Sequence, residues 1–206
     1  MTGRTAAPEY IVGVTGATGA IYAQRLLQWL VRREGLVVHV VCSAMAFKII
    51  EIELRRKPRR GRRLRVEDWV APRSEWRAAV REWEDTNFMA PVASGSHRVE
   101  GMAVVPCSMR ALASIDMGLG DNLIHRAADC CLKEHRRLVL VPRESPLTPA
   151  HLEQMARLAH QGVTILTPDP AWYTHPRTLD DFVDQIAMKV CDHLDLPPDV
   201  ERRWGG

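Results

Sequence analysis

Short apolar runs alternate with longer amphipathic segments along most of the chain, and this alternation limits the possible folds more than any other feature. The apolar runs at 10–14 and 37–41, for example, flank an amphipathic stretch at 20–33. A strand, a helix and a second strand in this order form a βαβ unit, in which the two strands run parallel. The sequence therefore predicts an α/β fold with helices around a central parallel sheet.

The same pattern predicts the elements along the rest of the chain. Strands are expected at 10–14, 37–41, 101–105, 138–141 and 163–166, and helices at 20–33, 44–55, from 108 onward, 122–134, 149–160 and 178–194. The charged stretch at 57–83 has little periodicity, and we expect in it one short helix at 74–83 capped by Ser74. Pro149 behind Thr148 marks a helix start, because proline fits the first helical position.

A chain of 206 residues with 46% hydrophobic residues can bury a substantial core. We expect one domain over 1–206, with a surface insertion at 55–65 and a tail at 195–206. The apolar runs are far shorter than the roughly 18 residues of a membrane helix, and the N-terminus lacks a signal peptide's apolar core. Five cysteines without a C-x-x-C pair indicate reduced thiols. A cytoplasmic protein without a metal site or disulfides is expected.

The insertion at 55–65 (RRKPRRGRRLR) holds eight basic residues and no acidic one, whereas the whole chain carries a net charge of only +3. A basic run of this kind can bind nucleic acid. This run has no aromatic residues between its charges and contains Pro58 and Gly61, so we expect a solvated surface loop instead.

Two predicted strand ends carry the first functional signals. Residues 15–20 (TGATGA) lead from a strand directly into a helix, where a glycine-rich turn lets the backbone and the helix dipole stabilise a phosphate. Residues 105–110 (VPCSMR) form a second such junction, and both would face one crevice of a doubly wound sheet. A phosphate-bearing ligand, a mononucleotide especially, is favoured. A tight structural turn and a simple N-cap at Ser108 are the alternatives, and Cys107 is expected to be a buried small residue.

Residues 122–144 hold several charged side chains. Arg126 and Lys133 lie two helical turns apart on one face, where ion pairs on a solvated surface are the alternative to a binding role. Arg143 and Glu144 directly follow a predicted strand, a position that opens on the crevice.

Residues 170–176 (PAWYTHP) form a rigid loop between prolines that presents Tyr173 and His175. Such a loop suits a lid over a ligand. Surface packing of Trp172 is an equally good interpretation.

Together these segments resemble the flavin prenyltransferase family, the UbiX type of FMN-binding protein associated with aromatic acid decarboxylases. The resemblance runs almost end to end through matched segments in one order: V-G-V-T-G-A-T-G-A, M-A-P-V-A-S-G-S, V-P-C-S-M, N-L-I-x-R-A-A-D, L-K-E-x-R-R-L-V-L-V-P-R-E-x-P-L, H-L-E-x-M, P-A-W-Y and R-R-W-G. It implies a three-layer Rossmann or flavodoxin-like fold, FMN at a subunit interface, a dodecamer built from trimers, and no metal.

The resemblance also implies a reaction, in which a dimethylallyl group from dimethylallyl monophosphate is joined to N5 and then C6 of reduced FMN. The prenylated FMN would serve a UbiD-type decarboxylase. The positions that match FMN-binding residues are Gly16, Ala17, Thr18, Ser43, Ser108, Met109, Arg110, Ala111, Arg126 and Arg143. The positions that match the substrate phosphate site are Lys133, Tyr173 and Lys189.

Two carboxylates receive catalytic roles from the same resemblance. Glu144 would donate a proton to the leaving phosphate, and Glu53 would relay protons near flavin N5 with the Thr18 hydroxyl. Without the resemblance, Glu53 reads as a solvated acid at a helix end.

The chain departs from the family pattern at three of these positions. Thr18 stands where serine is usual, Phe88 replaces a tryptophan that would stabilise cationic character, and Lys189 replaces an arginine. We expect slower or retuned activity rather than none. A non-catalytic FMN carrier for a decarboxylase system is the alternative function. The related cysteine decarboxylases are disfavoured, because their segment with paired Met and Asn has no counterpart here.

Overall fold

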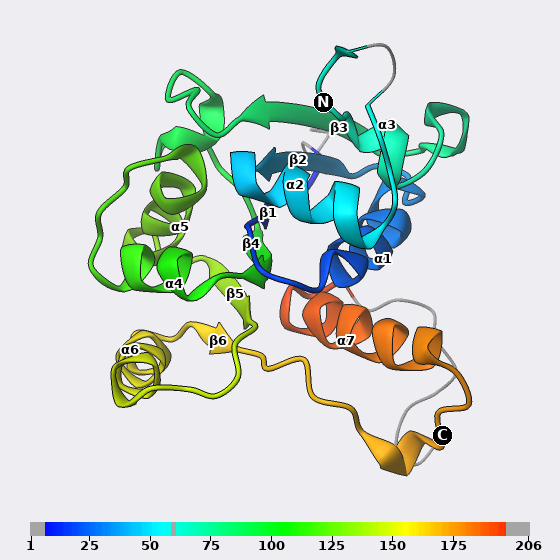
Figure 1. The fold of residues 1–206 in the computed structure, drawn as a ribbon. Helices are drawn as coiled ribbons and strands as arrows, with labels where there is room; N and C mark the ends of the chain where they lie inside the picture. Colours follow the sequence, from blue (N-terminus) through cyan, green and yellow to red (C-terminus); the bar gives the residue numbers. More distant parts are fainter. Residues whose placement is uncertain (1–6, 59–60, 197–206) are drawn as a thin grey trace.

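The computed structural model describes residues 7–58 and 61–196, and its centre is one parallel sheet (Figure 1). The six strands lie in the order β3-β2-β1-β4-β5-β6. Their bounds are β1 (Glu9–Val14), β2 (Val37–Cys42), β3 (Ala79–Glu84), β4 (Gly101–Cys107), β5 (Arg137–Pro142) and β6 (Thr164–Ile165). This is the strand order of the Rossmann fold, with its reversal between β1 and β4. The predicted α/β fold around a parallel sheet is confirmed.

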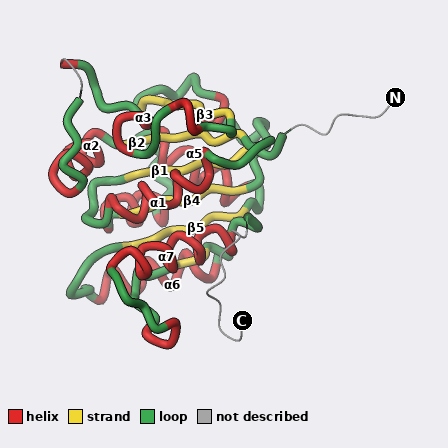
Figure 2. The backbone as a smooth tube through the Cα atoms, turned by 90° about the vertical axis from the view of Figure 1, so that its right-hand side faces the viewer, coloured by secondary structure: helices red, strands yellow, loops and turns green. Residues whose placement is uncertain are grey.

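Helices cover both faces of the sheet (Figures 1 and 2). On one face lie α1 (Ala20–Val31) and α7 (Leu179–His193), and on the other lie α4 (Met109–Asp116), α5 (Leu123–Lys133) and α6 (Pro149–His160). The short helix α2 (Ala44–Glu53) instead follows the rim where the strands end, since it starts at the end of β2 and its last residue contacts the start of α1. The arrangement has three layers, as expected.

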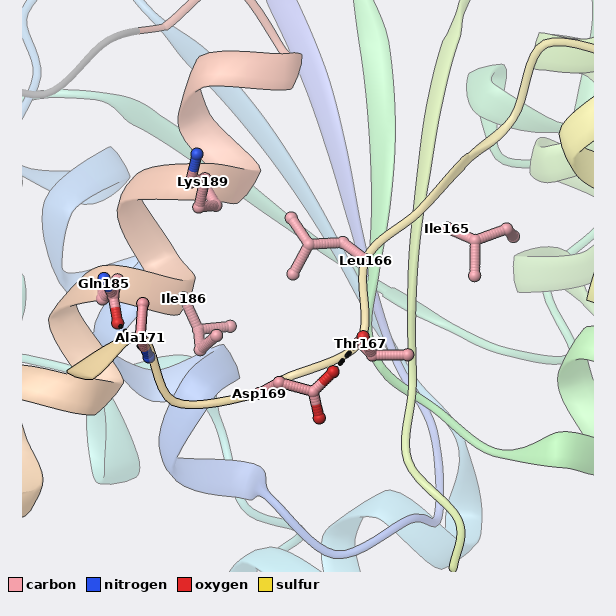
Figure 3. Close-up of a pocket in the computed structure, with 8 residues that line it drawn as sticks. All are labelled: Ile165, Leu166, Thr167, Asp169, Ala171, Gln185, Ile186 and Lys189. Carbon is pink, nitrogen blue, oxygen red and sulfur yellow. Dashed lines mark hydrogen bonds between the residues drawn. The ribbon is translucent and has the colours of Figure 1, made fainter. Parts of the chain in front are cut away.

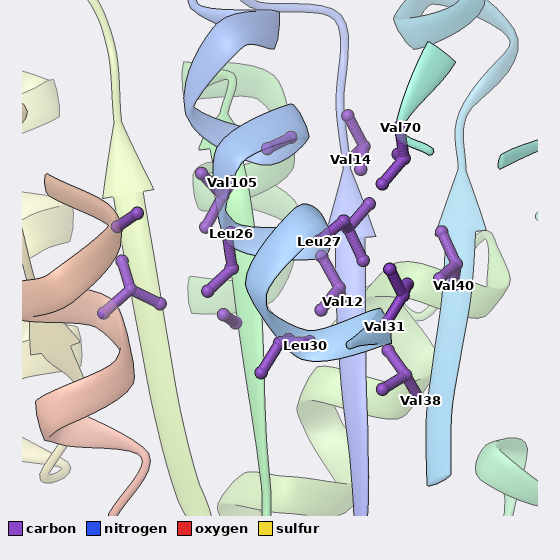
Figure 4. Packing of buried hydrophobic residues seen from close by; sticks show 14 of the residues in the cluster. Val12, Val14, Leu26, Leu27, Leu30, Val31, Val38, Val40, Val70 and Val105 are labelled. Carbon is purple, nitrogen blue, oxygen red and sulfur yellow. The ribbon is translucent and has the colours of Figure 1, made fainter. Parts of the chain in front are cut away.

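Each face of the sheet has its own hydrophobic core, because neighbouring residues of a strand point to opposite sides. Val12 packs with Leu27 and Val38 under α1 (Figure 4), whereas Ile11 packs with residues of α4 and α5. A Cβ atom on Gly13 would lie 2.9 Å from Ile124, so the glycine lets α5 approach the sheet closely.

The helix starts agree with the sequence signals. Thr148 Oγ1 accepts a hydrogen bond from His151 N (3.3 Å) at the start of α6, and Pro149 occupies its first position. Thr178 caps α7 in the same way through Asp181 N (3.2 Å). Gly162 ends the α6 turn with φ of 88°, a conformation that glycine adopts without strain.

The helix expected at 74–83 is wrong. A 3-10 turn, η2 (Arg73–Glu75), is followed there by the edge strand β3, and Ser74 caps nothing because the residue before the turn is Pro72. An edge strand has one partner and a solvent-facing side, so charged residues such as Arg81 and Glu84 dilute its apolar pattern. The stretch before it holds a further short helix, α3 (Val66–Trp69), which was not expected.

The second half of the basic segment 55–65 lies against the protein. Arg62 pairs with Asp68 (3.0 Å), Arg63 pairs with Glu84 (3.5 Å), and Leu64, the next residue, is buried. Residues 59–60, the end of the expected tail and the R-R-W-G motif lie outside the described residues. Among the described helices, none combines the length and the apolar character that crossing a membrane requires.

Candidate active site

A pocket of about 430 Å³ opens at the ends of β1 and β4, where the strand order reverses. It collects five of the residues expected to bind the cofactor: Gly16, Ser43, Ser108, Arg110 and Ala111. The two strand-end junctions singled out in the sequence therefore do face one crevice.

Thr15 joins these two junctions. Its Oγ1 donates to Pro106 O (2.8 Å) and accepts from Ser108 N (2.7 Å), and its backbone N–H also donates to Pro106 O (3.2 Å). Because Thr15 is buried, these bonds are shielded from water and hold the two turns in a fixed relation.

Three helices point their N-termini at the pocket. Ser43 caps α2 through Ala46 N (3.2 Å), Ser108 caps α4 through Ala111 N (3.2 Å), and Asn122 caps α5 through His125 N (2.9 Å). Ser108 therefore both caps α4 and lines the pocket. Helix N-termini carry positive partial charge, so their convergence favours an anionic group. A side chain at Gly16 would collide with Met45, which leaves backbone facing the pocket.

Thr18 and Glu53 meet next to this pocket. Thr18 Oγ1 donates to Glu53, whose carboxylate also accepts from Gly19 N (2.9 Å) and Ala20 N (2.8 Å). Gly19 precedes α1 with φ of 106° and has no side chain to cap the helix, so the carboxylate from α2 takes that part. Glu53 is therefore an exposed acid at a helix end whose carboxylate is hydrogen-bonded to the first turn.

Arg143 and Glu144 follow β5 at the same edge of the sheet. Arg143 N donates to Cys107 O (3.2 Å), and Glu144 Oε1 accepts from Ser145 N (3.1 Å). Burial raises the pKa of Tyr22 on α1, with opposing contributions from the charges of Arg143 and Glu53.

Arg126 and Lys133 are not brought to the pocket within this chain. Arg126 donates to Ala93 O (3.0 Å) and pairs with Asp129 (2.7 Å), whereas Lys133 pairs with Glu134 at the far end of α5. Eleven helical residues span about 16 Å, so Lys133 lies near the other end of the strands, away from the rim that carries the pocket.

Lys189 lines a second pocket, of about 270 Å³, between β6 and α7 (Figure 3). Asp169, Gln185 and Leu166 are among its other lining residues. This pocket shares no lining residue with the one at the β1 and β4 ends.

Four other expected site residues lie outside the lining of the larger pocket. Tyr173 is exposed in the turn η4 (Trp172–Thr174), and Phe88 is exposed after β3. Met109 turns into the core beneath α4, and Ala17 forms part of the first turn without lining the pocket.

The pocket also has lining residues that sequence reasoning did not assign: Ala44, Met45, Asp85, Asp121, Asn122 and His125. Asp85 follows the strand that was expected to be a helix, which hid its position at a strand end. Asn122 carried a usable signal, because asparagine directly before an apolar helical run is a preferred N-cap.

The cysteine thiols have no reactive character. Burial raises the pKa of Cys42 and of Cys107 to about 12, so neither forms a thiolate near neutral pH. Cys107 is a buried small residue, as expected.

Glu9, His39 and His97 form a cluster at the other end of the sheet whose ligand-type atoms lie within 4.8 Å of one another. Glu9 Oε2 contacts His39 Nε2 (2.6 Å) and His97 Nε2 (2.9 Å), while Trp83 Nε1 donates to His39 Nδ1 (2.9 Å). Since Nδ1 accepts this bond, Nε2 carries the ring proton. A metal at His39 Nε2 would require a doubly deprotonated ring, so the geometry fits a hydrogen-bonded cluster better than a metal centre.

Comparisons with known proteins agree with this arrangement. The family model for flavoproteins matches residues 3–191. The flavin prenyltransferase LpdB of Lactiplantibacillus plantarum is 41% identical over 95% of this chain and 97% of its own length. The chain belongs to the UbiX-type flavin prenyltransferase family.

Two solved structures of this family superpose over nearly the whole chain. A dodecameric FMN-dependent UbiX-like decarboxylase from Escherichia coli O157:H7 has a TM-score of 0.83 and 41% identity, with 96% of this chain and 100% of that chain covered. AnUbiX (PadA1), solved in complex with FMN and dimethylallyl pyrophosphate, has a TM-score of 0.82 and 36% identity, with 97% and 98% covered.

The residues of the pocket fit the flavin that the family binds. Three capped helix N-termini and Arg110 supply a site for a phosphate, and Gly16 exposes backbone to the pocket at the first turn. Of the positions expected to contact FMN, Gly16, Ser43, Ser108, Arg110 and Ala111 line this pocket within one chain.

Proposed function

We propose that this protein is a flavin prenyltransferase that binds FMN in the pocket at the β1 and β4 ends and joins to it the dimethylallyl group of dimethylallyl monophosphate. The observation that carries the proposal is the Thr18–Glu53 pair, in which Thr18 belongs to the same turn as the pocket residues Thr15 and Gly16 and Glu53 reaches it from the end of α2. A pocket that only stored FMN would need the phosphate site but no hydroxyl coupled to a carboxylate beside it.

Reduced FMN supplies the nucleophilic N5 and C6 atoms for bond formation. The chain supplies proton transfer: the Thr18 hydroxyl donates to Glu53, so its oxygen can accept a proton from a ligand while it passes its own to the carboxylate. The backbone donors Gly19 N and Ala20 N hold that carboxylate in place. The methyl group that distinguishes Thr18 from serine narrows the space around the relay.

Departure of phosphate from the allylic carbon requires cationic and acidic groups at the leaving oxygen. Arg143 and Glu144 stand at the rim of the sheet for this purpose, with Glu144 as the proton donor. Lys133, Tyr173 and Lys189 do not line the larger pocket of the same chain, so we assign them to the pocket of a neighbouring copy, together with Arg126.

An oligomer is supported by the surface of the chain. Large apolar side chains are exposed on separate segments, with Met89 at 92%, Ile52 at 73% and Trp172 at 72%. Burial of these side chains against other copies of the chain would remove apolar surface from water. We propose a homo-oligomer, a dodecamer as in the E. coli relative, with FMN at subunit interfaces.

The product is proposed to serve a UbiD-type decarboxylase in the cytoplasm. The five cysteines are all free and buried, which suits a reducing compartment.

The reaction is tested by incubating the protein without oxygen with reduced FMN and dimethylallyl monophosphate and by measuring the mass of the flavin. An increase of one five-carbon unit is expected. Bound flavin of unchanged mass would replace the proposal with that of an FMN carrier. Parallel incubation with the diphosphate shows which donor is preferred.

A further inference from the structure

His125 is a titratable group inside the larger pocket that the proposed reaction does not use. It lies in the first turn of α5, is 4% exposed and lines the pocket with Asp121, Asn122 and Arg110. The segment N-L-I-x-R-A-A-D that carries the family resemblance leaves this position unspecified, so the resemblance gives it no role.

The hydrogen bonds of the ring identify its protonation sites. Nδ1 contacts the carboxylate of Asp121, so the Nδ1–H donates to it. Asn122 Oδ1 accepts from His125 N (2.9 Å), which identifies Asn122 Nδ2 as the donor that lies 3.5 Å from Nε2. At this distance the contact with Nε2 is weak. Nε2 is therefore the nitrogen that remains available to a ligand.

The charged groups around His125 set the charge balance that a ligand meets in the pocket. On α4, Arg110 lines the pocket, and the turn before α5 contributes Asp121. The loop after β3 contributes Asp85, whose carboxylate accepts from Ala44 N (3.3 Å) and whose backbone O accepts from Leu123 N (2.7 Å). The lining thus holds two carboxylates and one guanidinium. A phosphate adds negative charge to this set, and one proton on Nε2 would offset it.

We propose that His125 is a proton-linked anchor for the phosphate of the flavin: FMN binding is accompanied by protonation of Nε2, which then donates to a phosphate oxygen while Nδ1–H stays bound to Asp121. This rests on the proposed function only in that the pocket holds FMN. In the step, one proton passes from hydronium or a buffer acid to Nε2, so one N–H bond forms, the donor's bond to that proton breaks, and no other covalent bond changes. The Asp121 carboxylate orients the ring and stabilises the imidazolium, so it is a positioning residue.

The proposal is tested with full-length protein by titrating oxidised FMN and riboflavin in a calorimeter, in two buffers of different ionisation enthalpy at about pH 7. The difference in heat gives the protons taken up per flavin. We expect net uptake with FMN in the wild type, less or none with His125→Asn, and none from this residue with riboflavin, which has no phosphate. Affinity of His125→Asn for FMN should fall about tenfold at pH 6, while its affinity for riboflavin stays within about twofold.

The phosphate of FMN itself titrates near pH 6, and comparing wild type with variant at each pH removes that contribution. Asp121→Asn keeps the imidazole but removes the carboxylate, and it should lower the proton uptake while the protein stays folded by circular dichroism. Equal proton uptake by wild type and His125→Asn overturns the proposal, as does an equal loss of affinity for FMN and riboflavin. Failure of the wild type to bind either flavin overturns the proposed function as well.

Discussion

Thr18 and Glu53 lie 35 positions apart in the chain and are joined by a hydrogen bond in which Thr18 Oγ1 donates to the carboxylate. The same carboxylate accepts from two backbone N–H groups at the start of α1. One side chain from α2 therefore closes the end of a neighbouring helix and contacts the hydroxyl beside the flavin pocket. Its structural and chemical parts can be separated by substitution.

Glu53→Gln should keep the fold and FMN binding but lower product formation about 100-fold or more, because an amide accepts hydrogen bonds and cannot take up the proton. Glu53→Ala should in addition lose about 1 kcal/mol of stability as the α1 cap disappears. Flavin mass after anaerobic turnover and thermal melting measure the two effects. Glu51→Gln on the same helix is the matched control and should behave like wild type in both.

Thr18→Val keeps the branched shape and removes the hydroxyl, so it should lose product formation as Glu53→Gln does. Thr18→Ser keeps the hydroxyl and removes the methyl, and it should retain or raise the rate. Single-turnover rates for both variants distinguish a proton relay from packing. Equal rates in the two variants would assign Thr18 a packing role only.

Glu144→Gln should bind FMN as wild type does and yet form little product, because the leaving phosphate loses its proton donor. Flavin fluorescence gives the affinity, and product mass gives the turnover. Glu153→Gln, an exposed acid on α6, serves as control. Normal turnover by Glu144→Gln would show that another group protonates the phosphate.

Lys133 provides a test of sites shared between copies. Lys133→Ala and Glu53→Gln should each be inactive as pure proteins. If the lysine acts in a neighbour's pocket, mixed oligomers made by co-expressing the two variants with different tags contain some sites that are intact. Product formed by the doubly purified mixture is the expected result. A mixture as inactive as its components would place both residues in one chain's site.

The sequence predicts the architecture well where local chemistry decides it. Ser108 and Thr178 cap the helices expected to follow them, and the buried strands β1, β4 and β5 are continuous apolar runs. The edge strand β3 escapes such reasoning, because solvent on one side permits charged residues that obscure its period.

Only part of the candidate site could be predicted from the sequence. Gly16 and Ser108, which follow β1 and β4, line one pocket, as expected for parallel strands that end at one rim. Ser43 after β2 also lines it, and only the family resemblance indicated that residue.

The ion pairs of Arg126 with Asp129 and of Lys133 with Glu134 match the alternative that local spacing offered for these two cations. The second pocket at Lys189 could not be inferred in this way, since spacing places residues on a helix but not relative to another element or another copy. No sequence pattern singles out His125, and only the structure shows that it lines the pocket.

Acid should weaken the fold through His39, which is fully buried under Trp83 and beside Glu9. Burial lowers the pKa of His39 from its ordinary 6.5, although the hydrogen bond with Glu9 acts in the opposite direction. Protonating Nδ1 would also set a second donor against the indole N–H of Trp83. Below about pH 6.5 the imidazole of residue 39 therefore binds a proton in the unfolded chain but not yet in the folded chain. Its contribution to the free energy of unfolding is present above this pH and is lost as the pH falls.

Protonation of the Glu9 carboxylate also destabilises the fold, at a lower pH than protonation of the imidazole. Burial alone would raise its pKa, but hydrogen bonds from His39 and His97 outweigh burial and lower it from 4.5, so its contribution is lost as the pH falls through the folded value.

His39→Phe should melt at a lower temperature than wild type at pH 7, because Trp83 and Glu9 lose their partner. It should also lose less stability between about pH 7 and pH 5, because its ring does not titrate. Melting temperatures measured at both pH values test this, with exposed His160→Asn as the control that should follow wild type. The same loss on acidification in His39→Phe and wild type would show that the buried imidazole does not govern acid stability.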